Sequence, residues 1–226
     1  MTPHSTPPLG YEVKFERVGV EGGADLQIRS LLDKQQFSDP LGLALDAGIS
    51  SATWPLFGLV WPSAQKLANL MQTWILDNKR VLEVGCGLAL ASMVVHRRQG
   101  NVTASDCHPL TETFLKANLA LNHLPPLPYE TGNWGRTNKG LDKFDLLIAS
   151  DVLYERNHPE QLSGFIQTHA AEGAEVLIID PNRSNRSAFH RDMDKLGFSV
   201  SEIMITDPLE DQSAYRGRLL HYTRDR

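Results

Sequence analysis

The stretch from Arg80 to Ala91 constrains the fold of this chain more than any other. It reads Arg-Val-Leu-Glu-Val-Gly-Cys-Gly-Leu-Ala-Leu-Ala, so a short apolar run stops at two glycines and an apolar, helix-compatible stretch follows. This pattern predicts a buried strand over 80–84, a tight turn at Gly85 and Gly87, and a helix over 88–97. Glycine suits such a turn because the backbone bends sharply and a ligand can approach without a Cβ in the way.

Two carboxylates indicate what this turn binds. Glu83 lies two residues before Gly85, and Asp106 directly follows a predicted strand over 101–105, 21 positions beyond Gly85. An acidic residue at that distance, at the end of the second strand of a βαβ unit, can accept hydrogen bonds from both hydroxyls of a ribose. The sequence therefore predicts a nucleoside site.

The kind of nucleoside follows from what the turn lacks. A dinucleotide-binding turn needs a third glycine where this chain has Leu90. Glu83 would also repel a phosphate held at the start of the helix. A ligand with a ribose, no phosphate and a cationic head fits better, and S-adenosyl-L-methionine (SAM) has all three properties. Its ammonium would be attracted to Glu83 through ordered water or backbone. A nicotinamide dinucleotide is the alternative.

The rest of the chain predicts an α/β fold. Alternation of apolar and polar residues predicts a β-hairpin from strands over 11–18 and 26–31. Apolar residues at helical spacing predict a helix after Pro62. Further strands and helices alternate up to residue 196, and two strands close the chain. Such alternation predicts a Rossmann-like, doubly wound, mostly parallel sheet with helices on both faces and an antiparallel C-terminal edge. The other predicted elements are a short helix over 41–46, strands over 129–131, 144–149, 175–180, 198–205 and 215–222, and helices over 110–122, around 162–169 and over 187–196.

We expect two parts in the chain. Residues 1–55 would form a loose tail over 1–9, the hairpin and the short helix, all packed on the core, and residues 56–226 would form the main domain. The net charge of −5 argues against a protein that binds nucleic acid through its overall field. No apolar run approaches the roughly 20 residues needed to span a bilayer, and the N-terminus lacks a signal pattern.

Cys86 and Cys107 are the two cysteines, and both fall in the predicted ligand-binding turns. We interpret them as reduced, small side chains rather than as a disulfide, which favours a cytoplasmic protein. We expect no metal site, because such a site needs more donors than these turns offer.

Three further groups of residues follow the predicted strands, where ligands of open α/β sheets collect. Asn133-Trp134 offers an amide and a ring for an adenine, or else a buried Trp without a ligand. Ser150, Asp151 and Tyr154 follow the strand over 144–149, where an Asp is also common as a helix cap. Asp180-Pro181-Asn182-Arg183 ends the next strand. Arg183, Arg186, Arg191 and Lys195 would meet an acidic partner or form a solvated face.

Large rings are concentrated just before the central strand. Trp54, Phe57 and Trp61 lie in the irregular stretch over 51–62. Their rings either plug the end of the sheet, or one of them, Trp61, lies near the cofactor, where a ring face attracts a cation.

At these residues the sequence resembles a known family. The Glu83-x-Gly85-x-Gly87 turn and Asp106 resemble class I (seven-β-strand) SAM-dependent methyltransferases. The segments Trp61-Pro62-Ser63, Asn133-Trp134-Gly135 and Asp151-x-x-Tyr154 resemble methyltransferase family 16, which holds many protein-lysine methyltransferases. Asp180-Pro181-Asn182-Arg183 is similar to an Asp-Pro-Gly-Arg segment of electron transfer flavoprotein β-subunit lysine methyltransferases, with Asn182 in place of the glycine.

The resemblance implies roles for these residues. Asp151 would capture and orient the methyl-accepting amine, and Tyr154 would wall it and hydrogen-bond to it. The implied function is transfer of a methyl group from SAM to a lysine of a protein. The alternatives are a small-molecule N-methyltransferase acting on nicotinamide or another small amine, and a non-catalytic SAM-binding scaffold. The sequence does not define the oligomeric state. The predicted cofactor residues are Trp61, Glu83, Gly85, Gly87, Asp106, Cys107, Asn133, Trp134 and Ser150.

Overall fold

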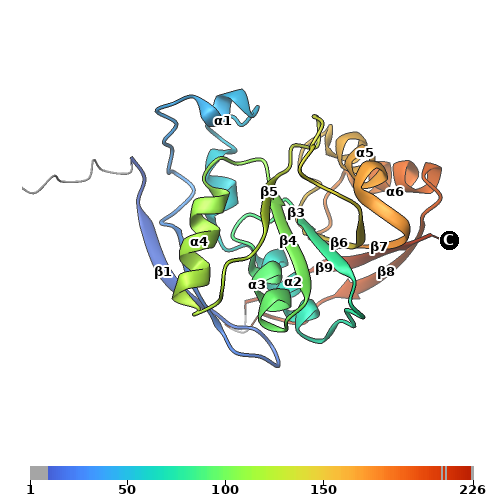
Figure 1. Ribbon diagram of the computed structural model, residues 1–226, viewed down its shortest axis with the longest axis horizontal. Helices are drawn as coiled ribbons and strands as arrows, with labels where there is room; N and C mark the ends of the chain where they lie inside the picture. Colours follow the sequence, from blue (N-terminus) through green and yellow to red (C-terminus); the bar gives the residue numbers. More distant parts are fainter. Residues whose placement is uncertain (1–9, 210, 212, 225–226) are drawn as a thin grey trace, which may run out of the picture.

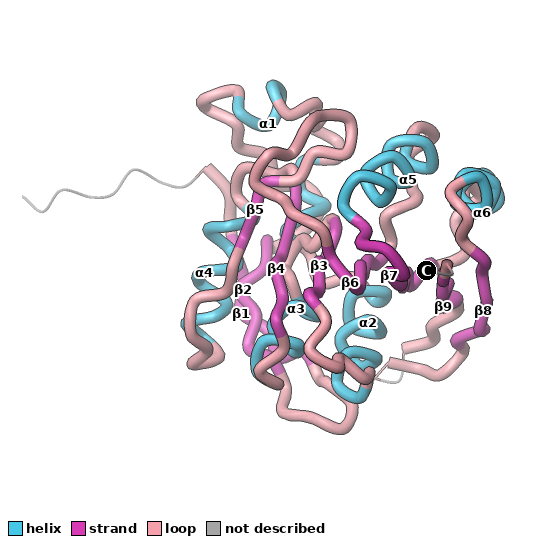
Figure 2. Tube along the Cα trace, turned by 45° about the vertical axis from the view of Figure 1, so that its right-hand side comes forward, coloured by secondary structure: helices cyan, strands magenta, loops and turns pink. Residues whose placement is uncertain are grey.

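A seven-stranded sheet forms the centre of the computed structural model, which describes residues 10–209, 211 and 213–224. The loose tail expected over residues 1–9 lies outside the described residues. The strands of the sheet lie in the order β5-β4-β3-β6-β7-β9-β8 (Figure 2). They are β3 (Arg80–Val84), β4 (Asn101–Asp106), β5 (Tyr129–Thr131), β6 (Phe144–Ser150), β7 (Ala170–Asp180), β8 (Ser199–Ile205) and β9 (Gly217–Thr223).

Strands β5, β4, β3, β6 and β7 run parallel, and β9 runs antiparallel to both of its neighbours. The predicted fold class is thereby confirmed, with one detail that the sequence did not predict. The antiparallel strand β9 lies between β7 and β8, so the outermost strand is β8, whose residues are nearly all exposed. After β7 the chain first forms the outermost strand, β8. It then turns back as β9 and pairs with β7, whose apolar residues 176–179 need a partner on that side.

Helices cover both faces of the sheet. Helices α2 (Pro62–Thr73), α3 (Leu90–Arg97) and α4 (Thr111–Leu121) pack into one apolar cluster with the sheet, and α5 (His158–His169) and α6 (Arg186–Lys195) pack into a second. Strand β3 lies between these layers and buries four of its five residues. A strand buried on both faces is mostly apolar rather than alternating, which explains Val81, Leu82 and Val84; the buried Glu83 is the exception.

The predicted N-terminal β-hairpin is present. Strands β1 (Val13–Val18) and β2 (Leu26–Leu31) form a separate antiparallel hairpin, which lies next to α4 (Figure 1). The chain then forms the short helix α1 (Leu43–Asp46) and a 3₁₀ helix, η1 (Trp54–Gly58), before it enters α2. Among the described residues, no helix combines the length and apolar character needed to cross a bilayer.

Candidate functional site

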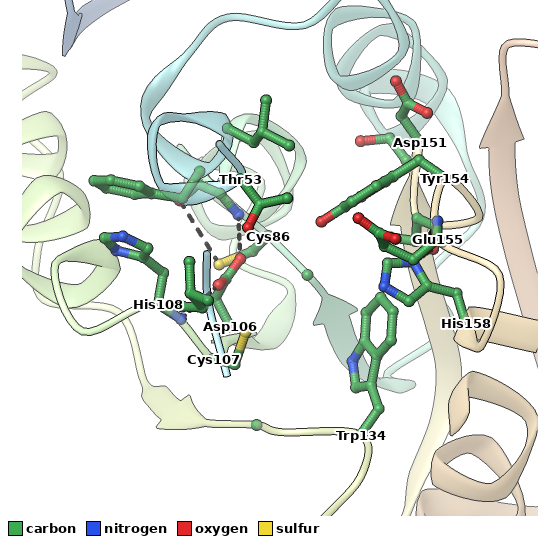
Figure 3. Close-up of a pocket in the computed structure, with 18 of the residues that line it drawn as sticks. Thr53, Cys86, Asp106, Cys107, His108, Trp134, Asp151, Tyr154, Glu155 and His158 are labelled. Atoms are coloured by element: carbon green, nitrogen blue, oxygen red, sulfur yellow. Dashed lines mark hydrogen bonds between the residues drawn. The ribbon is translucent and has the colours of Figure 1, made fainter. Parts of the chain in front are cut away.

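A large cavity lies at the carboxyl ends of β3, β4 and β6 (Figure 3). From β3 the chain continues to β4 on one side, and from β6 it continues to β7 on the other side. Open α/β sheets bind ligands in the crevice where the strand order reverses in this way. The cavity encloses about 810 Å³, which falls in the range of roughly 300–1,000 Å³ that small-molecule sites occupy. Every predicted site residue except Glu83 lines it.

The glycine turn forms the floor of this cavity. Gly85 and Gly87 have φ angles of 62° and 51°, in the left-handed region that glycine adopts without steric cost. A Cβ on Gly85 would lie 3.2 Å from side-chain carbons of both Trp134 and Val152, and one on Gly87 would lie 2.9 Å from the carbonyl oxygen of Phe57. The two glycines therefore let the backbone pass close to the opposite walls of the cavity.

Asp106 is fixed beside this turn at the end of β4. One carboxylate oxygen accepts the backbone N–H of Gly87 at 2.9 Å, and the other accepts the backbone N–H of His108 at 2.8 Å. Burial raises the pKa of Asp106, and the two N–H groups oppose that rise because they stabilise the anion. The neighbouring thiols of Cys86 and Cys107 are free, and burial raises both pKa values, so both stay protonated.

Glu83 lies beneath the turn rather than in the cavity. Its carboxylate is 2% exposed and accepts the backbone N–H of Ser92, in the first turn of α3, at 2.7 Å. Desolvation raises its pKa to about 7, although the hydrogen bond opposes the rise. Sequence reasoning predicted the carboxylate near the turn but not its direction, because a strand residue at the base of a turn can face either layer of the fold.

Aromatic rings form the wall contributed by the N-terminal segment. Trp54 is fully buried in the core, as one of the two sequence interpretations expected, whereas Trp61 is half-buried and lines the cavity. The indole N–H of Trp61 donates to the carbonyl of Leu56 at 2.8 Å, and the ammonium of Lys34 lies 4.9 Å from its ring centroid. The ring of Trp61 thus already faces a cation from its own chain.

His108 is a lining residue that sequence reasoning missed. Its ring stacks on Phe57 with centroids 3.6 Å apart, and burial lowers its pKa to about 3. A histidine two residues after the acid at the end of β4 gave no distinct signal, because its partner lies about fifty positions earlier in the chain.

The loop after β5 supplies another wall. Trp134 lines the cavity and meets His158 edge-on at 5.1 Å between ring centroids. The amide of Asn133 donates to the carbonyl of Ala47 at 3.3 Å, which joins this loop to the segment after α1. Ser150, at the end of β6, is half-buried and also lines the cavity.

Asp151 and Tyr154 lie across the cavity from Asp106 and Cys107 (Figure 3). The hydroxyl of Tyr154 points into the cavity, and burial, helped by nearby carboxylates, raises its pKa, so the phenol is neutral. Asp151 does not cap a helix, because α5 begins after Asn157. Its carboxylate instead receives two hydrogen bonds from Arg183, which sequence reasoning had expected on a solvated face or at an acidic partner.

The turn that carries Arg183 explains the departure from the Asp-Pro-Gly-Arg pattern. Asn182 has a φ of 65°, and asparagine is among the few residues besides glycine that tolerate this conformation. Its side chain adds hydrogen bonds from Arg186 at 3.2 Å and Arg218 at 3.1 Å. The substitution therefore preserves the turn.

The charge of the cavity favours a cation. With the carboxylates ionised and the histidines neutral, the lining carries a formal charge of −2, because Arg183 offsets one of three acids. A low-dielectric pocket of one sign focuses its field and attracts ligands of the opposite sign. The charged lining residues are Asp106, Asp151, Glu155 and Arg183.

Solved methyltransferases share this fold. A ribosomal protein L11 methylase from Lactobacillus delbrueckii subsp. bulgaricus superposes with a TM-score of 0.63 over 96% of this chain and 100% of its own, at 15% sequence identity. Magnesium protoporphyrin IX methyltransferase from Synechocystis PCC 6803, solved with bound SAH, superposes with a TM-score of 0.54 over 72% of this chain and 83% of its own, at 18% identity. The fold is therefore that of a Rossmann-like methyltransferase.

Sequence similarity narrows the assignment from this fold to one family of methyltransferases. Residues 47–195 match the model of the family described as lysine methyltransferase, methyltransferase family 16, and the chain belongs to that family. The chain is 32% identical over 148 residues to the electron transfer flavoprotein beta subunit lysine methyltransferase of Danio rerio, an alignment that covers 61% of this chain and 56% of that protein. It is 26% identical over 181 residues to the protein N-lysine methyltransferase METTL21A of Xenopus tropicalis, covering 74% and 80%. The chain thus spans little more than half of the zebrafish protein's length.

Proposed function

We propose that this protein is a SAM-dependent methyltransferase that transfers a methyl group to the side-chain nitrogen of a lysine in a protein substrate. The observation that carries this proposal is the negatively charged cavity, which has the glycine turn and Asp106 on one side and Asp151 with Tyr154 on the other. Membership of the lysine methyltransferase family supports the choice of acceptor.

The lining residues fit SAM. Gly85 and Gly87 hold the turn in the left-handed conformation that forms one side of the cavity, and the carboxylate of Asp106 is fixed beside this turn by two backbone N–H groups. Asp106 would accept the ribose hydroxyls on its free lone pairs, Cys107, Asn133 and Trp134 would surround the adenine, and Ser150 and Trp61 would complete the wall. The buried carboxylate of Glu83 would favour the ammonium from beneath the turn rather than by contact.

The reaction needs a positioned amine without its proton. SAM, when bound, supplies an electrophilic methyl group on a sulfonium. The lone pair of the amine forms the new N–C bond while the C–S bond breaks, and its electron pair stays on sulfur. Only about one lysine in 2,500 is neutral at pH 7, and burial beside a cation lowers the pKa of the amine. Asp151 would accept a hydrogen bond from the amine, and the Tyr154 phenol would orient it.

The partner follows from the acceptor. We propose a protein that presents a lysine at the cavity mouth, in line with relatives that are themselves named for methylating protein lysines. The two free cysteines support a cytoplasmic location.

Two measurements test this function. We expect calorimetry to give binding heat with SAM and with its demethylated product but none with NADH. Incubation with radiolabelled SAM and a cell extract should place label in acid-precipitable protein. Label confined to the soluble fraction would indicate a small amine as acceptor, and tight SAM binding with no label anywhere would indicate a scaffold.

Asp151→Ala separates the acceptor side of the cavity from the cofactor side. We expect the variant to bind SAM as the unmodified protein does but to transfer at least about 100-fold more slowly, because misplacing a nucleophile by about 1 Å costs that much. Asp194→Ala, at an exposed position of α6 outside the cavity lining, is the matched control. Parallel loss of SAM affinity in Asp151→Ala would assign Asp151 to the cofactor site.

A further inference from the structure

Asp151 and Arg183 form an ion pair at the mouth of the cavity. Nε of Arg183 lies 2.7 Å from Oδ1 of Asp151, and Nη2 lies 2.8 Å from Oδ2. Such a bidentate fork fixes both side chains in one geometry. The carboxylate is 13% exposed and the guanidinium side chain 41%, so the acid faces inward and the base forms the rim.

Hydrogen bonds join the two loops that carry this ion pair. Asp180 accepts the backbone N–H of Arg183 at 2.8 Å and so fixes the turn that follows β7. The amide of Asn185 donates to the carbonyls of Leu153 and Glu155, both at 2.9 Å, and so joins this turn to the loop after β6. The fold therefore holds the two loops together and places the backbone of Arg183 where its side chain reaches the carboxylate of Asp151.

The pair changes what Asp151 does to an incoming amine. An unpaired carboxylate within about 4–6 Å stabilises the ammonium and raises its pKa, which works against transfer. A guanidinium on both oxygens offsets that charge while each oxygen keeps a lone pair for a hydrogen bond.

The other charged groups near Asp151 leave this balance in place. Asp180 is buried and lies 3.8 Å from Arg186, and the hydroxyls of Tyr154 and Tyr215 have raised pKa values and are neutral. Burial lowers the pKa of His158, so it is neutral as well. Two further carboxylates line the cavity: Asp106 lies across it from Asp151, and Glu155 is exposed at its mouth.

We propose that Arg183 is a positioning residue that neutralises Asp151, so that a lysine amine bound at Asp151 loses its proton near neutral pH. This inference rests on the proposed methyltransferase function. It makes Arg183 a determinant of the pH at which the protein works, although Arg183 itself does not touch the reacting atoms.

The test is the pH dependence of methyl transfer. Initial rates of label incorporation from radiolabelled SAM into the acid-precipitable protein of one cell extract are measured between pH 6 and pH 10. The unmodified chain is compared with Arg183→Met, Arg183→Gln, Arg183→Lys and, as a matched control, Arg191→Met at an exposed position of α6. Thermal unfolding and SAM calorimetry accompany each variant.

The proposal predicts a shift in the rising limb of the profile. In Arg183→Met and Arg183→Gln the midpoint should move to higher pH by roughly one unit or more, which is about a tenfold loss of rate below the midpoint. Arg183→Lys keeps the cation, so its midpoint should stay close to that of the unmodified chain even where its plateau falls. Arg191→Met should match the unmodified chain in both.

Different failures point to different errors. If the unmodified chain labels protein but the neutral variants keep its midpoint, the inference about Arg183 is wrong and the proposed function stands. Unfolding of both neutral variants also overturns it, because Arg183 would then be structural. If the unmodified chain transfers no label to protein, the proposed function fails and this inference fails with it.

Discussion

Glu83 and Asp106 are buried carboxylates at the ends of neighbouring strands, and their surroundings give them different tasks. Asp106 is held by two backbone N–H groups and lines the cavity. Glu83 accepts one N–H from α3 and is enclosed by protein, which raises its pKa from 4.5 to about 7. Because folded Glu83 gains or loses its proton near neutral pH, the free energy of unfolding depends on pH through this carboxylate.

Glu83→Gln should reveal this coupling. The unfolded chain loses the proton near pH 4.5 and the folded protein near pH 7, so the folded state binds more protons between these values. The free energy of unfolding therefore falls as the pH rises through this window, by at most about 3 kcal/mol from this one group. Glutamine has no such proton to lose.

Urea denaturation at pH 5, 6, 7 and 8 measures the effect. The stability of the unmodified protein relative to Glu83→Gln should fall steadily as the pH rises from 5 to 7 and then level off. Acids that do not interact with Glu83 contribute equally to both proteins and cancel in this difference. A difference that stays constant across the four pH values would show that Glu83 ionises normally.

At the scale of elements, helix α4 serves as the partner of the edge strand β2. The amide of Asn118 accepts the N–H of Arg29 at 2.7 Å and donates to its carbonyl at 3.3 Å, and the amide of Asn122 makes the same two bonds with Gln27, both at 2.8 Å. Side chains four apart on a helix are about 6 Å from each other, which matches two residues of a strand. Two asparagines on α4 thus satisfy a backbone edge that would otherwise be open to aggregation.

The two asparagines should differ in their contribution. Asn118 is fully buried, so Asn118→Ala leaves the backbone groups of Arg29 without a partner and should lower the free energy of unfolding by roughly 2 kcal/mol. Gln27 is exposed, so water replaces the lost bonds in Asn122→Ala, which should cost under about 1 kcal/mol. Urea denaturation of both variants measures the two losses in the free energy of unfolding. Equal losses would mean that burial does not govern this contact.

At the scale of the whole molecule, both predicted parts of the chain, residues 1–55 and 56–226, contribute to the cavity. Residues 47–50 and Thr53 line one wall, and η1 spans the boundary itself. The N-terminal segment also buries large side chains against the sheet and α4. Burial of one such side chain contributes about 1.5–3 kcal/mol, and a whole domain is stable by only about 5–15 kcal/mol. These buried side chains are Leu26, Ile28, Leu31 and Trp54.

A chain that begins at residue 56 should therefore not behave as an independent domain. We expect it to lose at least about 6 kcal/mol of stability, to unfold without a cooperative transition and to bind SAM more weakly than the full chain. Scanning calorimetry and SAM titration of the two chains test this. A sharp transition at the Tm of the full chain would establish residues 56–226 as a self-sufficient unit.

The sequence by itself determined the order of the strands and α-helices and the edge of the sheet where the site lies, but not the 3₁₀ helix η1. Apolar period, glycine and proline are local signals, and parallel strands bring their carboxyl ends to one edge whatever their neighbours are. Only the tertiary structure decided which way Glu83 points, that His108 stacks on Phe57, that β9 lies inside the edge, and that Arg183 grips Asp151 from 32 positions away. These features depend on which side chains meet when distant segments pack, and no local pattern along the chain encodes such a meeting.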